Sequence, residues 1–320
     1  MAGVRSLPSF SRRLFWPLFF GFIFRLFSGL VLPLPKPTPM QPPQTVFLTG
    51  CAQGIGGHLA QAFYGRGWQV VATDYDLPAL QAATAAWDPA RRLVLALDVA
   101  DPAAWEAAVA QAQARFGALH VLVNNAGVVA PGFAAELRVA DIDWQVDVNL
   151  KGVLYGSRLA ARLMSAQGHG HLINLASLAG VAPIHGLAVY SATKFAVRGF
   201  TLAVAYELAR HGVAVSVICP DLVQTNMLTQ QVGEPAAAMS FSGPAALTVH
   251  DVEHAVFGRA LGQRQVEILL PASRGILAKL GNFWPRLGRL LTGRLMAKGQ
   301  QVQRQYQRQY QREKAGKKEG

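Results

Sequence analysis

The chain has 320 residues, of which 51% are hydrophobic and 15% charged, a composition that excludes a disordered protein and allows one large buried core. The formal net charge of +12 lies at the two ends. Residues 1–44 contain five Lys and Arg with no acid, and residues 273–320 contain twelve Lys and Arg against two Glu. The segment between them is mildly acidic, so we expect no nucleic-acid partner. Two cysteines, Cys51 and Cys219, are too few for a disulfide scaffold and fit a reducing compartment.

The N-terminal 44 residues combine an apolar segment with a proline-rich linker. Residues 14–34 are largely apolar, interrupted by Arg25, and are about as long as the ~20 residues that cross a bilayer. Three interpretations stay open: a hairpin or interfacial anchor, a single span, and a signal or targeting peptide. A single span with a cytoplasmic catalytic domain conflicts with the positive-inside tendency, and a hairpin does not. We expect a membrane-associated protein whose catalytic domain faces the cytoplasm.

From residue 45 to residue 272, short apolar runs alternate with segments of helical length. The predicted strands cover 45–49, 70–73, 93–97, 121–124, 172–175, 213–218 and 266–270. Helices are predicted between them, for example over 56–65, 102–115 and 190–211. Alternating strands and helices are typical of a parallel sheet covered on both faces. The predicted fold class is therefore α/β, a single Rossmann-type, doubly wound parallel sheet.

A glycine-rich turn follows the first predicted strand. Gly50, Gly54 and Gly56 lie between that strand and a predicted helix, where glycines permit close approach of the backbone to a pyrophosphate at the helix N-terminus. Asp74 follows the second predicted strand, where a carboxylate can accept both ribose hydroxyls and repel the 2′-phosphate of NADP. The sequence therefore predicts NAD as the cofactor and disfavours NADP.

Residues 273–320 form a third predicted region. Ile276, Leu280 and Phe283 recur at helical spacing, and basic residues occupy the other faces of the segment. Two interpretations stay open: a helix lying on a membrane surface, and a helix packed on its own domain. For residues 303–320, polar and cationic, we expect a frayed helix or a disordered tail.

Five motifs occur in one order along the chain: TGCAQGIG at 49–56, LDV at 97–99, NNAG at 124–127, Ser177 in LINLASLAG, and YSATK at 190–194. Together with Asn149 they resemble the motifs of the classical short-chain dehydrogenase/reductase family. The resemblance covers roughly residues 45–270. It implies a catalytic set of Asn149, Ser177, Tyr190 and Lys194. It implies cofactor contacts from Gly50, Gln53, Gly54, Ile55, Gly56, Asp74, Asp98, Val99, Asn125, Ala126, Gly127, Tyr190, Lys194, Pro220, Val223 and Thr225.

The chemistry of these residue types agrees with the resemblance. A secondary alcohol must lose a proton as hydride leaves, and Tyr190 can accept it as phenolate. Lys194 lies four residues later on the same helix face, where its ammonium group can stabilise that phenolate. Ser177 can donate to the developing oxyanion. The resemblance further implies that Asn149 holds a water for proton relay. The eight histidines show no ligand spacing with a carboxylate, so we expect no metal site.

One position departs from the family pattern. Asp221 follows Pro220 where the family usually has glycine, so we expect a changed loop backbone near the nicotinamide. The segment 227–248, where the family places its substrate lid, contains Glu234 as its one acid and has no Lys or Arg. A lid with so few charges favours a hydrophobic substrate.

The functional expectation is NAD-dependent hydride transfer to or from a hydrophobic alcohol or carbonyl compound, such as a retinoid, steroid or lipid. The apolar N-terminus, the core and the basic C-terminus together are similar to membrane-associated retinol and hydroxysteroid dehydrogenases of the family. Expected partners are a small hydrophobic substrate, a membrane surface and a second copy in a homo-oligomer. Two alternatives stay open: a carbonyl or 3-oxoacyl reductase, and a membrane-tethered dinucleotide-binding scaffold without turnover.

Overall fold

The computed structural model describes residues 44–283 and 285–316. Seven strands form one sheet in the order β3-β2-β1-β4-β5-β6-β7, and every neighbouring pair is parallel. The strands are β1 (Thr45–Thr49), β2 (Gln69–Asp74), β3 (Arg92–Ala96), β4 (Val121–Asn124), β5 (Gly170–Leu175), β6 (Val213–Pro220) and β7 (Glu267–Leu270). The predicted parallel Rossmann-type sheet is confirmed, with each strand within a few residues of its predicted bounds.

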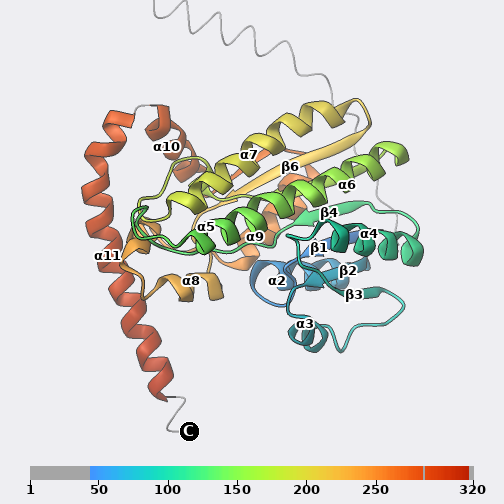
Figure 1. Ribbon diagram of the computed structural model, residues 1–320, viewed down its shortest axis with the longest axis horizontal. Helices are drawn as coiled ribbons and strands as arrows, with labels where there is room; N and C mark the ends of the chain where they lie inside the picture. Colours follow the sequence, from blue (N-terminus) through green and yellow to red (C-terminus); the bar gives the residue numbers. More distant parts are fainter. Residues whose placement is uncertain (1–43, 284, 317–320) are drawn as a thin grey trace, which may run out of the picture. The chain divides into compact units, whose positions relative to one another are not determined.

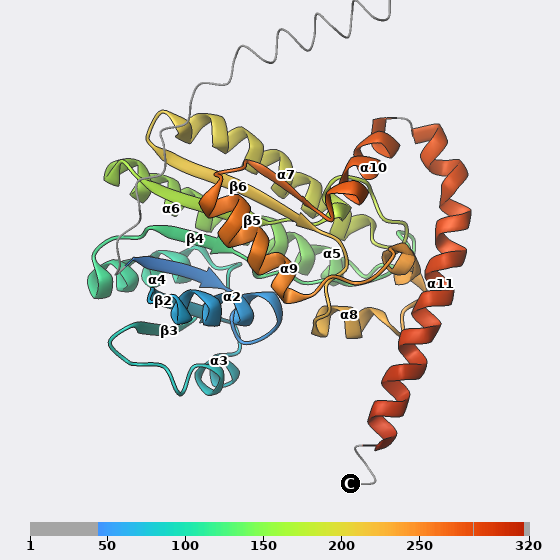
Figure 2. The same cartoon turned by 180° about the vertical axis from the view of Figure 1, so that it is seen from behind.

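Helices cover both faces of this sheet (Figures 1 and 2). The α-helices are α2 (Gly54–Gly65), α3 (Leu77–Ala83), α4 (Pro102–Phe116), α5 (Val139–Val146), α6 (Gly152–Gln167), α7 (Ala188–Ala209), α8 (Asn226–Gln231), α9 (Val249–His254), α10 (Ala272–Phe283) and α11 (Pro285–Gly316). Short 3-10 or π segments are η1 (Asp147–Lys151), η2 (Leu178–Gly180), η3 (Pro235–Ser242) and η4 (Ala255–Gly262). The helices α2, α9 and η4 contribute to one core, and α4, α6 and α7 contribute to the other.

Successive side chains of a strand point to opposite faces of the sheet, so a central strand contributes residues to both cores. In β1, Val46 and Leu48 face the core beneath α2, whereas Phe47 faces the opposite core and stacks on Trp105 of α4 with ring centroids 5.5 Å apart. All three strand residues are fully buried. A strand buried on both faces needs apolar residues on both, which is why Val46, Phe47 and Leu48 form a continuous apolar run between two buried threonines.

The strand order reverses direction between β1 and β4. In open parallel sheets, a crevice forms at the carboxyl ends of the strands where the order reverses. The glycine-rich turn follows β1, and NNAG begins in β4, so the fold places both motifs at this crevice.

The C-terminal region differs from one expectation. Of the two alternatives predicted for residues 303–320, the disordered tail is wrong for residues 303–316, because α11 continues through Gly316. The Gln303 side chain is buried and donates hydrogen bonds to the carbonyl oxygens of Gln231 and Glu234, both at 2.8 Å. This polar residue of α11 is therefore bonded to the folded domain. No helix within residues 44–283 and 285–316 is long and apolar enough to cross a membrane. The predicted N-terminal anchor and linker lie outside the described residues.

A three-residue ion-pair cluster links the last strand, β7, to the helices α7 and α10. Glu267 of β7 pairs with Arg198 of α7 at 2.6 Å and with Lys279 of α10. Burial raises the pKa of Glu267, but hydrogen bonds from Lys279 and Arg198 outweigh that effect, so the pKa lies below its ordinary value. Because the pKa of Glu267 is lower in the folded than in the unfolded protein, ionised Glu267 stabilises the fold at pH values above its unfolded-state pKa. This contribution disappears as the pH falls through the pKa of the folded protein.

We predict that Glu267→Gln lowers the free energy of unfolding at neutral pH by about 1–3 kcal/mol, because a charge-assisted hydrogen bond is lost. Urea unfolding of wild type and variant between about pH 7 and pH 4 measures the difference, which should shrink as the pH falls. Glu106→Gln is the matched control, because Glu106 and Arg158 are both about two-thirds exposed and 3.9 Å apart. Equal decreases in the free energy of unfolding of the two variants would contradict a stabilising role of the cluster.

Candidate active site

The glycine turn after β1 leaves room for a phosphate group at the start of α2. Gly50 and Gly54 have φ values of +70° and +60°, which L side chains rarely adopt. A Cβ atom at Gly56 would lie 1.9 Å from the Gly50 carbonyl oxygen, so only glycine fits there. Gln53 is the N-cap of α2, so Gly54 and Gly56 lie in the first turn of this helix. These residues fit a dinucleotide pyrophosphate, which helix N-termini attract.

The NNAG segment holds this turn in place. The Asn125 side-chain amide donates to the carbonyl oxygens of Thr49 and Gly50, at 2.8 and 3.2 Å. In return, the Thr49 hydroxyl oxygen accepts hydrogen bonds from the backbone of Asn125 and Ala126, both at 3.0 Å. The preceding Asn124 is buried and donates to Asn174 of β5 at 2.8 Å. Asn125 and Ala126 therefore shape the cofactor loop through its backbone.

Asp74 lies at the carboxyl end of β2, beside the glycine turn. Its two carboxylate oxygens accept hydrogen bonds from the backbone of Ala52 at 2.8 Å and of Asp76 at 3.0 Å. Each oxygen retains a second lone pair, so the carboxylate can also accept ribose hydroxyl groups. Asp98 is exposed beyond the end of β3, next to buried Val99. The predicted cofactor contacts of Asp98 and Val99 stay predictions.

Tyr190 and Lys194 lie one turn apart on α7, as their spacing predicted. Lys194 is 4% exposed, and its Nζ donates to the Leu175 carbonyl oxygen at 3.0 Å. The same Nζ lies 5.6 Å from the centroid of the Tyr190 ring. One of the three ammonium donors is thus used by the protein, and two remain for a cofactor or a water.

Burial shifts the ionisation of both groups. It raises the pKa of Tyr190 to about 12, and a hydrogen bond with Ser177 opposes the shift. It lowers the pKa of Lys194 to about 8, an effect that nearby Cys219 opposes. At neutral pH the tyrosine is therefore a phenol in the protein alone, and the lysine still carries its proton. Stabilisation of a phenolate depends on positive charge brought close to the Tyr190 oxygen.

Asn149 is fully buried in the π-helical segment η1. Its side-chain oxygen accepts from the Val128 amide at 2.7 Å, and its nitrogen donates to the Val128 carbonyl at 2.8 Å. A Cβ atom at Gly127 would lie 3.3 Å from the Asn149 oxygen and 3.5 Å from Lys194 Nζ, so the three residues converge. Asn149 therefore positions the backbone after NNAG, and its role in holding a water stays a prediction.

The loop after β6 closes the cleft from the other side. The Asn226 side chain donates to Gln53 of the glycine turn, and the Thr225 methyl group lies near Gly54. The inner cleft, about 110 Å³ in volume, is lined by Ser177, Tyr190 and Lys194 of the predicted catalytic set, whereas Asn149 does not line it. From the predicted cofactor set it is lined by Ile55, Asn125, Gly127, Pro220, Val223 and Thr225. Ile184, Leu187 and Gln231 also line it. Sequence reasoning did not single out these three, because their separate segments meet only in the folded chain.

The unusual Asp221 is explained by an ion pair. Its carboxylate accepts from Arg274 Nε of α10 at 2.5 Å, and the Asp221 side chain is 8% exposed. Arg274 also donates to the Ser242 hydroxyl at 3.0 Å. Burial raises the pKa of Asp221, and the guanidinium group opposes that shift. The residue that replaces glycine thus ties the cofactor-side loop to the C-terminal helices.

The fold also assembles a cluster that the sequence did not predict. His58 of α2 lies 2.6 Å from Glu253 of α9, and His250 lies 3.4 Å from the same carboxylate oxygen. The three ligand atoms lie within 4.8 Å of one another. However, the second Glu253 oxygen pairs with Arg66 at 2.6 Å, so a cation already balances this carboxylate. We interpret the cluster as an ion-pair network between α2 and α9, separated by nearly 200 residues in sequence.

Comparison with known proteins agrees with this geometry. The family model for short chain dehydrogenase matches residues 44–235. A 3-alpha-(or 20-beta)-hydroxysteroid dehydrogenase of Mycobacterium tuberculosis is 40% identical over 184 residues, covering 58% of this chain and 70% of that protein. A short chain dehydrogenase/reductase structure from Burkholderia phymatum, in complex with NAD, is 27% identical, with a TM-score of 0.68 over 77% of this chain and 95% of that one.

The fold alone does not select the cofactor. The structure of ElxO with NADP bound is 23% identical to this chain, with a TM-score of 0.64 over 71% of this chain and 98% of that one. At this identity the likeness shows the fold and no more. Structures with this fold therefore contain either dinucleotide. From its family match, its glycine turn and its Ser177, Tyr190 and Lys194 cluster, the chain belongs to the short chain dehydrogenase family and is an oxidoreductase acting on alcohol or carbonyl groups.

Proposed function

We propose that the protein transfers hydride between NAD and a hydrophobic primary or secondary alcohol, of retinoid, steroid or other lipid-like chemistry. One observation carries the proposal: Ser177, Tyr190 and Lys194 line one cleft, together with apolar side chains. Those apolar side chains include Ile184, Leu187, Met227 and Leu228. A mostly apolar wall with few convergent polar groups is typical of sites for small hydrophobic ligands.

Tyr190, Ser177 and Lys194 have separate roles in alcohol oxidation. The substrate hydroxyl donates its proton to Tyr190, and the Ser177 hydroxyl orients and stabilises the developing oxyanion. The Lys194 ammonium group, buried and held by the Leu175 carbonyl, favours the phenolate form of Tyr190. Bound nicotinamide would supply the hydride acceptor. In the reverse direction, the Tyr190 phenol returns the proton to the carbonyl oxygen.

Replacing Tyr190 should remove the proton acceptor. We predict that Tyr190→Phe lowers kcat/KM for alcohol oxidation by about 10²–10⁴-fold, the usual contribution of a positioned acid–base group. Because the pKa of Tyr190 in the protein alone is raised to about 12, wild-type oxidation should accelerate as the pH rises from about 6 to about 8. Above that pH, Lys194, whose pKa is about 8, loses the ammonium charge that favours the phenolate. The variant should show a flat profile. Steady-state rates on a panel of hydrophobic alcohols measure both effects.

The control for this experiment is dinucleotide binding. Tyr190→Phe keeps the aromatic ring, so its NADH affinity, measured by fluorescence, should match that of wild type. A variant that binds NADH normally and keeps full activity would contradict the mechanism. A variant that loses NADH binding would report a damaged fold instead.

The cofactor preference rests on Asp74. Its carboxylate stands at the end of β2 with a free lone pair on each oxygen after its two backbone hydrogen bonds. A negative charge there repels the 2′-phosphate of NADP and suits the free hydroxyls of NAD. We therefore propose NAD as the cofactor.

We predict that Asp74→Asn lowers the ratio of NADH affinity to NADPH affinity by about tenfold or more. The substitution removes the repulsion between the Asp74 carboxylate and the 2′-phosphate of NADPH, and such like-charge repulsion in a binding site costs more than ~1.4 kcal/mol. The Asn oxygen can keep one backbone hydrogen bond, so the loop should keep its shape. Asp76→Asn serves as the control, because Asp76 lies two residues further along the chain and its side chain caps α3. Fluorescence titration with both reduced dinucleotides gives the ratio. An unchanged ratio in Asp74→Asn would contradict this assignment.

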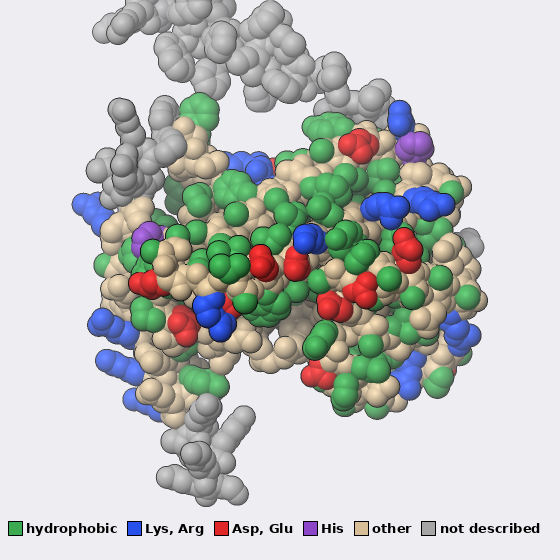
Figure 3. Space-filling model, in the orientation of Figure 1, with side chains coloured by type: hydrophobic (Ala, Val, Ile, Leu, Met, Phe, Trp, Pro, Cys, Tyr) green, Lys and Arg blue, Asp and Glu red, His purple; other side chains and the backbone are tan. Residues whose placement is uncertain are grey.

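We further propose that the C-terminal helices bind a membrane surface. Four apolar side chains of α10, Ile276, Leu277, Leu280 and Phe283, are 54–76% exposed. Lys and Arg side chains project from α11 along one edge of the molecule (Figure 3), and those described there, Arg294, Lys298, Arg304, Arg308 and Arg312, are exposed. Apolar side chains beside basic ones favour a peripheral position on anionic lipid.

We predict that the double change Leu277→Ser and Phe283→Ser weakens binding to vesicles of phosphatidylcholine and phosphatidylserine by about tenfold or more, since each apolar side chain contributes ~1.5–3 kcal/mol when buried. The comparison uses protein lacking residues 1–40, so that the N-terminal segment cannot mask the effect. Tyr206→Ser is the control, because Tyr206 is 84% exposed on α7. Equal sedimentation of all three proteins with the vesicles would overturn this proposal.

A further inference from the structure

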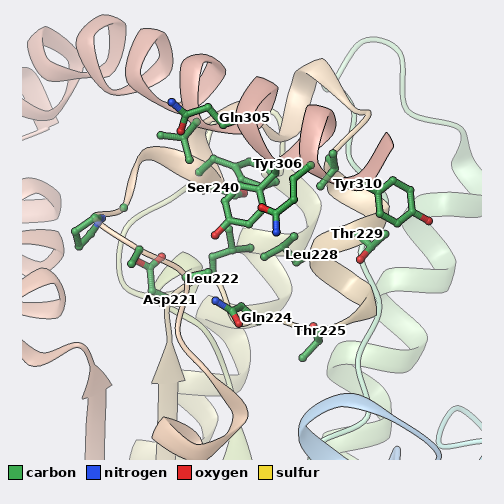
Figure 4. A pocket seen from close by; sticks show the side chains of 18 of the residues that line it. Asp221, Leu222, Gln224, Thr225, Leu228, Thr229, Ser240, Gln305, Tyr306 and Tyr310 are labelled. Atoms are coloured by element: carbon green, nitrogen blue, oxygen red, sulfur yellow. The ribbon is translucent and has the colours of Figure 1, made fainter. Parts of the chain in front are cut away.

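A second cavity adjoins the catalytic cleft. It has a volume of about 690 Å³ and lies between the loop after β6, the η3 segment and the C-terminal helix α11. Figure 4 shows Gln305, Tyr306 and Tyr310 of α11 on one side of it, and Asp221, Leu222 and Thr225 on the other. We call this cavity the outer chamber. The family match ends at residue 235, so it does not account for the α11 wall.

The two cavities share part of their walls. Five residues line both the inner cleft and the outer chamber, namely Asp221, Leu222, Thr225, Leu228 and Ser240. Ligand pockets usually measure ~300–1,000 Å³. The inner cleft, at about 110 Å³, must accept the reacting carbon beside Tyr190 and is too small for a whole lipid-like substrate. The outer chamber, at about 690 Å³, lies within the usual range.

The wall formed by α11 is firmly attached. Val302 and Tyr306 belong to an apolar cluster with Leu228 and Phe241, and the Tyr306 and Phe241 ring centroids are 5.8 Å apart. The Gln303 side chain donates to two carbonyl oxygens at the end of α8 and the start of η3. Close packing also occurs at Gly299, where a Cβ atom would lie 2.0 Å from the Ala238 carbonyl oxygen. The helix is thus a fitted part of the domain.

The chamber is lined by both apolar and hydrogen-bonding side chains. Leu222, Leu228 and Phe241 contribute apolar surface, and Gln224, Thr229 and Gln305 contribute amides and a hydroxyl. Such a lining accepts an apolar skeleton and tolerates an oxygen function far from the reacting carbon.

We propose that the outer chamber is the binding site for the distal part of an elongated, largely apolar alcohol or ketone, and that α11 sets the length of substrate the protein accepts. The inference rests on the proposed function. The reacting carbon lies in the inner cleft beside Tyr190, and the rest of the molecule passes Leu222 and Leu228 into the outer chamber. Residues far beyond the family match thereby determine specificity.

Filling the chamber from α11 tests the proposal. Gln305 lines the chamber and is exposed, so Gln305→Trp adds an indole to the cavity without removing a core side chain. Gln307→Trp is the matched control, because Gln307 is an exposed residue of the same helix that does not line the chamber. Full-length proteins are compared with NAD and a series of secondary alcohols from 2-butanol to 2-decanol.

We expect Gln305→Trp to lower kcat/KM for 2-decanol by about tenfold or more and to change that for 2-butanol by less than about twofold. The control should change neither. Equal losses for the short and the long alcohol, or equal effects of the two Trp variants, would overturn the proposal while leaving the proposed function intact.

Calorimetry separates this proposal from the function on which it rests. If wild type oxidises no alcohol of the series, the proposed function fails, and 2-decanol binding to the NADH-loaded proteins still tests the chamber. Binding about tenfold weaker in Gln305→Trp than in Gln307→Trp supports the chamber. Equal binding by both variants, or no binding by wild type, overturns it.

Discussion

The site depends on one buried cation beside a phenol. Lys194 is almost wholly buried, with its ammonium group held by the Leu175 carbonyl at the end of β5. Burial opposes the charged forms of both Lys194 and Tyr190. The protein therefore keeps the tyrosine neutral until further positive charge is brought close to the phenol oxygen. Such a pair is suited to a reversible proton transfer coupled to movement of hydride.

The rest of the domain fixes the geometry of that pair. The parallel sheet aligns the ends of β1, β4, β5 and β6 at one edge, so that the glycine turn, NNAG, Ser177 and Pro220 reach the same cleft. Hydrogen bonds between backbone and side chains at Thr49, Asn125 and Asn149 hold the turns there. Most motif residues therefore hold the backbone in place through hydrogen bonds, and few have side chains left to contact a substrate.

The C-terminal region is joined to the loop after β6 and to the segments that follow it. Asp221 directly follows β6 and pairs with Arg274 of α10, and α11 leans on η3 through Gln303. Both contacts bring residues after β7 against the loop that closes the cleft. In this chain the C-terminal helices are thus packed against the loop that closes the cleft, besides presenting apolar and basic side chains outward.

The sequence by itself determined the order of strands and helices, the glycine turn and the one-turn spacing of Tyr190 and Lys194, because each is a local pattern of a few residues. Only the tertiary structure showed that residues 303–316 are part of a helix packed on the domain. Their polar composition suggests a free tail, but the Gln303 side chain donates hydrogen bonds to the carbonyl oxygens of Gln231 and Glu234. It likewise decided the partner of Asp221 and the meeting of His58 with Glu253. These contacts join residues far apart in the chain, and their energy depends on burial and distance, which no local pattern encodes.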